Sequence, residues 1–182
     1  MNPTPGAFLV AEPPLADPNF RRTVILLCEH SLEGSFGLVL NRPTGRRISE
    51  VSATPLTFDG DIGLGGPVQP DTLHYLHPYG DEVDGSLPVV EGVYWGGEFE
   101  QVQELLEGGA LDAEQFRFFL GYSGWSTGQL DAEHDEGSWI VLPATSEAVW
   151  AAADPRLWNR VIRQLGGDYA LLSNYPDDPR MN

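Results

Sequence analysis

The stretch Gly121-Tyr-Ser-Gly-Trp-Ser-Thr-Gly-Gln-Leu130 brings together glycines, two aromatic rings and several hydroxyl groups. The apolar run before it predicts a strand over residues 116–121, and the residues after it predict a short helix over 129–135. Residues 124–128 also match the G-x-S-x-G pattern, in which a tight turn between a strand and a helix exposes a nucleophilic serine. We therefore expect Ser126 at a strand-to-helix turn, acting either as a nucleophile or as a structural cap of the helix.

A serine hydrolase also needs a base, and His134 is the only histidine that follows Ser126 in the chain. It falls on the predicted helix that leaves the same turn, so its side chain would point along that helix and away from the serine. The series of βαβ units on which such hydrolases are built is not visible in this sequence. The structural role of the turn is therefore favoured, and catalysis by Ser126 is the alternative.

Apolar runs elsewhere predict a mainly antiparallel sheet. The run Val24-Ile-Leu-Leu-Cys28 is typical of a strand covered on both faces, and the glycine-containing segment 30–35 predicts a hairpin to the next strand. We expect Pro43 to end that next strand, because proline lacks a ladder donor. Residues 53–72, rich in Gly, Pro and Asp, predict an ordered loop, and residues 78–88 predict a turn. The predicted strands cover residues 8–11, 23–29, 36–41, 73–77, 93–95, 116–121 and 138–142.

Two longer helices are predicted from their apolar stripes and end signals. Residues 98–107 place four apolar side chains on one face and glutamates on the other, and two glycines follow as a stop. Asp154-Pro155 predicts the start of a second helix, with Asp as the N-cap and Pro at the first helical position. Gly166-Gly167 would end this helix, and the tail from Tyr175 onward is expected to cover the surface.

The length of 182 residues suits one globular domain over residues 1–182. No apolar run approaches the roughly 20 residues that a membrane helix needs, and Met1–Glu12 lacks the regions of a secretory signal. A single cysteine excludes an intrachain disulfide and a multi-cysteine zinc site. We therefore expect a cytoplasmic protein with no membrane association.

The net charge of −17 lies in one part of the chain. Residues 1–50 contain five Arg and five acidic residues, whereas residues 51–182 contain five Arg and 22 Asp and Glu. Such a field repels phosphate backbones, which bind proteins by releasing counterions to basic side chains, so direct nucleic-acid binding is not expected. The group Arg42, Arg46 and Arg47 could still contact one phosphate, although a solvated loop is the favoured interpretation.

Every basic residue in the chain is arginine. An acidic surface without ammonium groups is expected of a protein that works in concentrated salt, where the Debye length falls to about 3 Å at 1 M. We therefore hypothesise a halophilic host. A GC-rich genome would explain the missing lysine, but it explains the acidity less well. Thermal melting with and without molar KCl tests the hypothesis, and a stability that does not change with salt would contradict it.

Two histidine-containing pairs are candidate chemical sites. Cys28 and His30 lie two residues apart on a predicted strand and so share a face, as a thiol and its base do. A cysteine in an apolar strand is more often inert, because desolvation disfavours the thiolate. His74 and His77 lie three apart, on opposite faces of a strand, and do not form a metal pair. No metal or cofactor is predicted, and Cys28 and His30 remain alternative catalytic residues beside Ser126.

Several short motifs in a fixed order carry a family resemblance. They are Asp17-Pro-Asn-Phe20, Arg22-Thr-Val-Ile-Leu-Leu-Cys-Glu-His30, Gly37-Leu-Val-Leu-Asn-Arg-Pro43, Gly65-Gly-Pro-Val68, and Gly121-Tyr-Ser-Gly-Trp-Ser126 with Gly128-Gln-Leu130. Together they resemble the bacterial AlgH/YqgE family over nearly the whole chain, from about Gly6 to Asn182. Thr127 stands where the family motif usually has proline, so this turn is expected to be a little less rigid.

The resemblance implies a single α+β domain, in which a bent, mixed and largely antiparallel sheet forms a pseudo-barrel with helices packed around it. It implies no settled biochemistry, although a transcriptional-regulator label is attached to the family. We expect a non-enzymatic regulatory domain that binds an unknown protein or small molecule and is linked to transcription only indirectly. A small serine hydrolase or acyl-transferring enzyme that uses Ser126 is the alternative.

The motifs contain more Gly, Asn, Arg and Ser than packing requires. We hypothesise that one set of their residues converges on a single ligand or partner surface. The set is Asn41, Arg42, Gly65, Gly66, Ser123, Trp125, Ser126 and Gln129.

Overall fold

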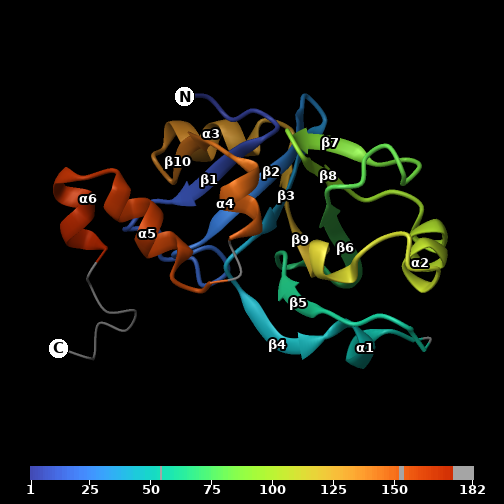
Figure 1. The fold of residues 1–182 in the computed structure, drawn as a ribbon. Coiled ribbons are helices and arrows are strands. Elements are labelled where there is room, and N and C mark those ends of the chain that lie inside the picture. The colour runs from blue at the N-terminus through green and yellow to red at the C-terminus, as the bar shows by residue number, and fades with distance from the viewer. Residues whose placement is uncertain (54, 152–153, 174–182) are drawn as a thin grey trace.

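The computed structural model describes residues 1–53, 55–151 and 154–173. Its strands form one ten-stranded sheet surrounded by six α-helices (Figure 1). The strands are β1 Ala7–Ala11, β2 Val24–Ser31, β3 Gly34–Val39, β4 Pro43–Arg47, β5 Asp61–Leu64, β6 Val68–His77, β7 Leu87–Val90, β8 Val93–Trp95, β9 Arg117–Ser126 and β10 Trp139–Pro143. The helices are α1 Ile48–Val51, α2 Phe99–Glu107, α3 Gln129–Asp135, α4 Ser146–Trp150, α5 Leu157–Gln164 and α6 Gly167–Leu172, with a 3-10 turn at Ala113–Gln115.

The sheet is organised around β9. The main strand order is β10-β1-β2-β3-β9-β6-β8-β7, with β5 attached to β9 and β4 attached to β5. Every pair is antiparallel except β5 with β9, which is parallel. The C-terminal half of β9 pairs with β3, whereas its N-terminal half pairs with β5 and β6. The sheet curls into a half-barrel, which confirms the predicted α+β fold with a bent, largely antiparallel sheet.

Glycine is required where β9 crosses the turn between β5 and β6. Gly121 has φ +65, and a Cβ at this position would lie 2.6 Å from the carbonyl oxygen of Gly66. The partner strand β6 has a register shift between Val68 and Leu73, opposite this point. The glycines of the opening motif thus allow two backbones to approach closely within the strand.

Two apolar cores lie on different parts of the sheet. The first packs β1, β2 and β3 against α3, α4 and α5, and it includes Trp158, which is 1% exposed. Residues 24–27 of β2 are fully buried, which confirms the prediction of a strand covered on both faces. The second core packs β5, β6 and β9 against α1 and α2 around Phe118. The segment from β4 to β5 contributes Ile48, Phe58 and Ile62 to this second core.

Several predicted boundaries are wrong. The strand predicted over 116–121 continues as β9 to Ser126, because close backbone contact with β3 and β6 keeps the glycine-rich segment extended. β3 ends at Val39, before Pro43, but Pro43 itself begins β4. A proline is tolerated there because β4 pairs only with β5 and is an edge strand. The predicted loop 53–72 contains β5 and the start of β6, and the predicted turn 78–88 contains the start of β7.

The longer helices match their predictions better. α2 begins one residue later than predicted, and α3 covers the predicted residues. The predicted start of α5 is wrong, because the helix begins at Leu157 with Arg156 at the N-cap. Asp154 accepts from the backbone nitrogen of Arg156 at 2.8 Å and so stabilises the turn before the helix. Gly166, with φ +73, follows α5 as a stop, but a further helix, α6, begins at the next residue.

The predicted surface tail from Tyr175 onward lies outside the described residues, so a single domain that extends over all of residues 1–182 stays a prediction. None of the helices in the described ranges is long and apolar enough to cross a membrane.

Candidate functional site: a cleft beneath the β4–β5 arm

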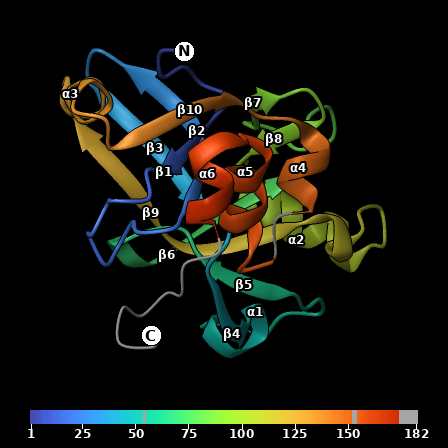
Figure 2. The ribbon, with the colours of Figure 1, turned by 90° about the vertical axis from the view of Figure 1, so that its left-hand side faces the viewer.

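The segment from β4 through α1 to β5 forms an arm that projects from the sheet (Figures 1 and 2). We call residues 43–53 and 55–64 the β4–β5 arm. Its only strand pairing with the rest of the sheet is the parallel register of β5 with β9, from Ile62 opposite Phe118 to Leu64 opposite Leu120. The arm is therefore joined to the rest of the sheet through β5 alone.

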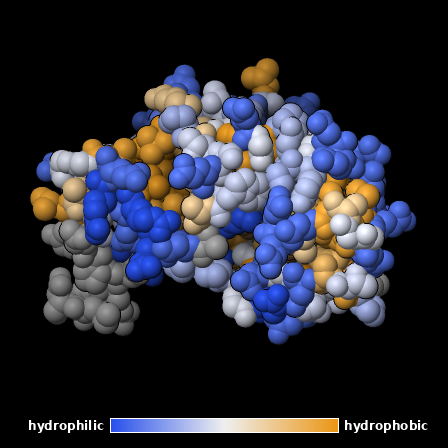
Figure 3. Space-filling view, viewed as in Figure 1, coloured by the Kyte–Doolittle hydropathy of each residue, from blue (hydrophilic) through white to orange (hydrophobic). Residues whose placement is uncertain are grey.

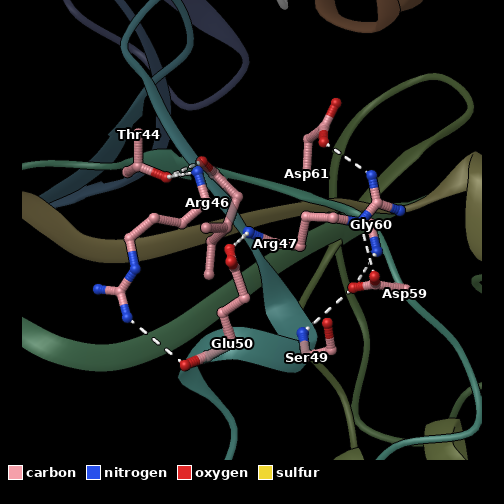
Figure 4. A network of polar contacts seen from close by, with 9 residues as sticks. Thr44, Arg46, Arg47, Ser49, Glu50, Asp59, Gly60 and Asp61 are labelled. Atoms are coloured by element: carbon pink, nitrogen blue, oxygen red, sulfur yellow. Dashed lines mark hydrogen bonds and ion pairs between the residues drawn. The ribbon is translucent and has the colours of Figure 1, made fainter.

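A network of polar contacts holds the arm together (Figure 4). Arg47 donates from Nε to Asp59 Oδ2 at 2.6 Å and from Nη1 to Asp61 Oδ1 at 3.2 Å. The other oxygen of Asp59 accepts from the backbone nitrogens of Ser49 at 3.2 Å and Gly60 at 2.9 Å. The hydrogen bond from Arg47 and those from the backbone hold the pKa of Asp59 well below its usual range.

We expect the arm to loosen as the pH falls. Because the folded-state pKa of Asp59 is lowered, its contribution is present above the unfolded-state value of about 3.9 and is lost as the pH falls through the folded-state pKa. Amide hydrogen exchange at about pH 5 and about pH 2.5 should show reduced protection of Ser49 and Gly60 at the lower pH, after correction for intrinsic rates. Asp59→Asn should remove most of this difference. Equal protection of both amides at the two pH values would contradict the expectation.

A cleft of about 570 Å³ separates the arm from the body of the protein. The space-filling view shows the surface hollowed beside the arm (Figure 3). The cleft is lined by Leu40, Arg42, Pro43, Gly45, Arg46, Arg47, Asp59, Gly60, Asp61, Ile62, Gly63, Ala113, Glu114, Phe116, Arg117, Phe118 and Trp150. Four of the ten arginines of the chain are in this set.

Three of these arginines form no ion pair with a carboxylate of the described residues. Within those ranges, Arg42, Arg46 and Arg117 have no carboxylate at ion-pair distance, although the chain has 27 Asp and Glu and the more distant Asp17 acts electrostatically on Arg42. Arg42 donates to the backbone oxygen of Pro18 at 3.0 Å, and Arg46 donates to that of Glu50 at 3.5 Å, and neither partner lines the cleft. Their hydrogen-bond partners are thus carbonyl oxygens, which do not neutralise the positive charges.

Arg117 is the most constrained of the three. Its Nη1 donates to the backbone oxygen of Val149 at 2.7 Å, and its Nη2 donates to that of Leu40 at 2.8 Å. The guanidinium also lies 5.2 Å from the ring centroid of Phe119. Burial lowers the pKa of Arg117 to about 10, so the group stays charged at neutral pH in a poorly solvated place. A fixed cation of this kind is suited to anion binding.

Arg46 and Arg47 are exposed, as expected, but their assignment to a loop is wrong. Both residues lie in β4, and both line the cleft. The pairing of β4 with β5 gives them this position, and the sequence prediction missed it because β5 was assigned to a loop.

The residues of the hypothesised ligand surface lie in three groups. In the first group, Asn41 is buried, accepts from the backbone nitrogen of Val24 at 2.9 Å and donates to the backbone oxygen of Arg22 at 2.9 Å. Its neighbour Arg42 is the only member of the set among the lining residues of the cleft. Asn41 therefore supports the segment that carries Arg42.

The second group supports the crossing between β9 and the β5–β6 turn. Ser123 is fully buried and donates from Oγ to the backbone oxygen of Gly65 at 3.1 Å. A Cβ on Gly66 would lie 2.2 Å from the backbone of Tyr122. These contacts join backbones and present no side chain to a cavity.

The third group surrounds Glu133 of α3. The Nε1 atoms of Trp125 and Trp139 donate to Glu133 Oε2 at 2.9 and 2.8 Å. Gln129 donates to Glu133 Oε1 at 2.9 Å, and its own Oε1 accepts from Ser126 Oγ at 3.1 Å. In the described structure these contacts hold α3 against the end of β9, so the hypothesis of one shared ligand surface stays a prediction.

The contacts of Ser126 and Cys28 in the described residues are not those of a nucleophile and its base. Ser126 is exposed and bonds to Gln129, whereas His134 Nδ1 lies 3.1 Å from the backbone oxygen of Trp139. Cys28 is buried beside a register shift in β2, and burial raises the pKa of its thiol.

His30 contacts a different serine. Its Nδ1 lies 2.8 Å from Ser35 Oγ, and its Nε2 lies 3.6 Å from Asp131. Among the described residues, no group of three or more His, Cys, Asp and Glu side chains is placed to hold a metal ion.

Sequence reasoning missed Arg117, Asp59, Asp61 and Trp150 as site residues. Arg117 carried a usable signal, because it is a single charge between Phe116 and Phe118 in an apolar strand. A charged side chain in a buried strand needs hydrogen-bond or ionic partners, so its presence there indicates a special role.

The similarity to known proteins covers almost the whole chain. The AlgH-like family model matches residues 8–170. A UPF0301 protein of Chlorobaculum tepidum is 47% identical over 98% of this chain and 95% of its own, and one of Cytophaga hutchinsonii is 43% identical over 98% and 99%. The solution structure of the AlgH protein from Pseudomonas aeruginosa matches 98% of this chain and 100% of its own, with 30% identity and a TM-score of 0.73. By sequence and by fold, the chain belongs to the AlgH-like family.

Proposed function

We propose that this protein is a non-enzymatic binding domain whose small ligand occupies the cleft beneath the β4–β5 arm. The observation that carries the proposal is the set of Arg42, Arg46 and Arg117, which line one cleft without a carboxylate partner in the described part of a chain with net charge −17. Arg46 is exposed, but Arg117 is poorly solvated, and an unneutralised guanidinium is costly in such a place. An anionic ligand would offset that cost and would account for the arrangement.

The alternative function, a hydrolase or acyl-transferring enzyme using Ser126, has less support. Its Oγ donates to Gln129, and the nearest histidine in sequence, His134, faces a backbone oxygen. Ser126 is also absent from the residues that line the cleft. A nucleophile needs a base within hydrogen-bond reach, and the described contacts of Ser126 include none.

The cleft also supports a regulatory role. A ligand bound between Arg46 on the arm and Arg117 on β9 would hold the arm in one position relative to the sheet, and a partner protein would recognise that position. Any effect on transcription would be indirect, because the net charge of −17 repels a phosphate backbone. We also propose that the protein works in the cytoplasm, and that its strongly acidic composition reflects a halophilic host.

Hydrogen exchange with a mixture of natural small molecules tests the binding proposal. The small-molecule fraction of a bacterial extract should protect amides of β4, β5 and the start of β9, because these elements line the cleft. Arg46→Ala should remove that protection. Arg156→Ala is the matched control, since Arg156 is an 83% exposed arginine outside the cleft. Protection confined to other elements, or none at all, would refute the proposal.

A further inference from the structure

We propose that the cleft ligand is an organic monophosphate with a planar apolar body, of the class of nucleoside monophosphates. This inference rests on the proposed function and adds the chemistry of the ligand. Three observations carry it: the guanidinium groups without a carboxylate partner in the described residues, the net charge of the lining and the half-buried ring of Trp150 beside them.

The guanidinium groups favour a phosphate. Arg46 lies on the arm, Arg42 lies just before the arm, and Arg117 lies on β9, so the cations come from separate segments around one cleft. A phosphate group has three oxygens that accept from several directions, and arginine matches it with paired donors. A carboxylate has only two oxygens and satisfies fewer of these donors.

The charge of the lining limits the number of phosphates. Four arginines and three carboxylates, those of Asp59, Asp61 and Glu114, leave the lining with one net positive charge, 4 − 3 = +1. The rest of the chain is strongly acidic. A phosphomonoester carries a charge of about −1.5 to −2 at pH 7, which this lining matches better than the larger charge of a triphosphate.

The size of the cleft and its apolar lining require an organic body. The cleft volume of about 570 Å³ falls within the range of roughly 300–1,000 Å³ that is typical of organic ligands. The apolar part of its lining includes Leu40, Ile62 and Phe116, which are only 2%, 2% and 6% exposed, and Trp150, which is half-buried. The Trp150 ring therefore offers the main apolar surface on which a planar base can stack. Inorganic phosphate alone would leave this ring uncovered.

Calorimetric titration at low ionic strength tests the ligand class with defined probes. The probes are AMP, GMP, CMP, UMP, adenosine, ATP, inorganic phosphate and a short 5′-phosphorylated oligoribonucleotide. We expect at least one nucleoside monophosphate to bind roughly tenfold or more tightly than phosphate, adenosine and ATP, which corresponds to about 1.4 kcal/mol. Arg46→Ala should weaken that binding about tenfold, whereas Arg156→Ala should leave it unchanged. Trp150→Leu should weaken binding of the nucleotide but not of phosphate.

Each outcome separates the two proposals. If the small-molecule fraction protects the cleft but no monophosphate binds, the ligand class is wrong and the binding function stands. If neither the fraction nor any probe acts on the cleft, both proposals fail. Equal binding of phosphate and nucleotide overturns the planar body, and tighter binding of ATP overturns the single phosphate. Tighter binding of the oligonucleotide would mean that the phosphate belongs to an RNA end.

Discussion

Gly66→Ala should destabilise the protein by roughly 2–5 kcal/mol, the sum of the usual costs of overpacking and of a positive φ in a residue with a side chain. Gly66 has φ +156, and a Cβ there would lie 2.2 Å from the backbone of Tyr122 and 2.4 Å from the nitrogen of Ser123. Both neighbours are backbone atoms of β9, so neither can rotate away. Urea unfolding monitored by circular dichroism gives the change in free energy of unfolding.

Gly45→Ala is the matched control for this substitution. Gly45 has φ +71, but a Cβ there would meet no atom within 4 Å. Its cost should therefore be only the roughly 1–2 kcal/mol of the left-handed backbone. A Gly66→Ala variant no less stable than Gly45→Ala would mean that the crossing of β9 and the β5–β6 turn can open without penalty.

Glu133→Ala should cost roughly 2–6 kcal/mol, because it leaves two indole N–H groups without their acceptor at about 1–3 kcal/mol each. Trp125 and Trp139 are 5% and 3% exposed, and both donate to the same oxygen of Glu133. Their rings also meet edge to face, with centroids 6.0 Å apart. Urea unfolding followed by tryptophan fluorescence measures the loss of stability and the exposure of these rings together.

Two further variants are controls for Glu133→Ala. Glu133→Gln keeps an oxygen acceptor for the indoles and should lose less than half as much stability. Glu136→Ala removes an exposed glutamate at the C-terminal end of the same helix and should change stability by less than about 0.5 kcal/mol. If Glu133→Ala resembles Glu136→Ala, the indole contacts do not hold α3 in place.

Local patterns predicted the parts of the fold that local residues determine. The apolar run of β2 identified a strand buried on both faces, and the stripe and glycine stop of α2 identified that helix to within one residue at its start. The candidate motif around Ser126 was located correctly next to α3, but its glycines were assigned to a turn. Gly128 does lie in the turn, at the N-cap of α3, but Gly124 lies inside β9. The strand continues through these residues, and Gly121 admits the backbone of Gly66, which is far away in sequence.

The cleft could not be predicted in the same way. Arg117 bonds to Leu40 across 77 residues and to Val149 across 32 residues, and no local pattern announces either contact. β5 has only one buried residue, Ile62, so its apolar signal was too short to distinguish it from a loop. The sequence shows the group Arg42, Arg46 and Arg47, but it does not reveal β5, the strand whose pairing with β4 places these residues at the cleft.

The position of β9 in the chain has a consequence for synthesis on the ribosome. β3 ends at Val39, but its partner along the open edge is completed only at Ser126. At about 5–20 residues per second, the roughly 90 residues between them take roughly 4–18 s to translate. During that interval the nascent β1–β2–β3 meander has an unpaired edge, which is open to pairing with another chain. The newborn protein is therefore expected to depend on a chaperone that shields this edge until β9 leaves the exit tunnel.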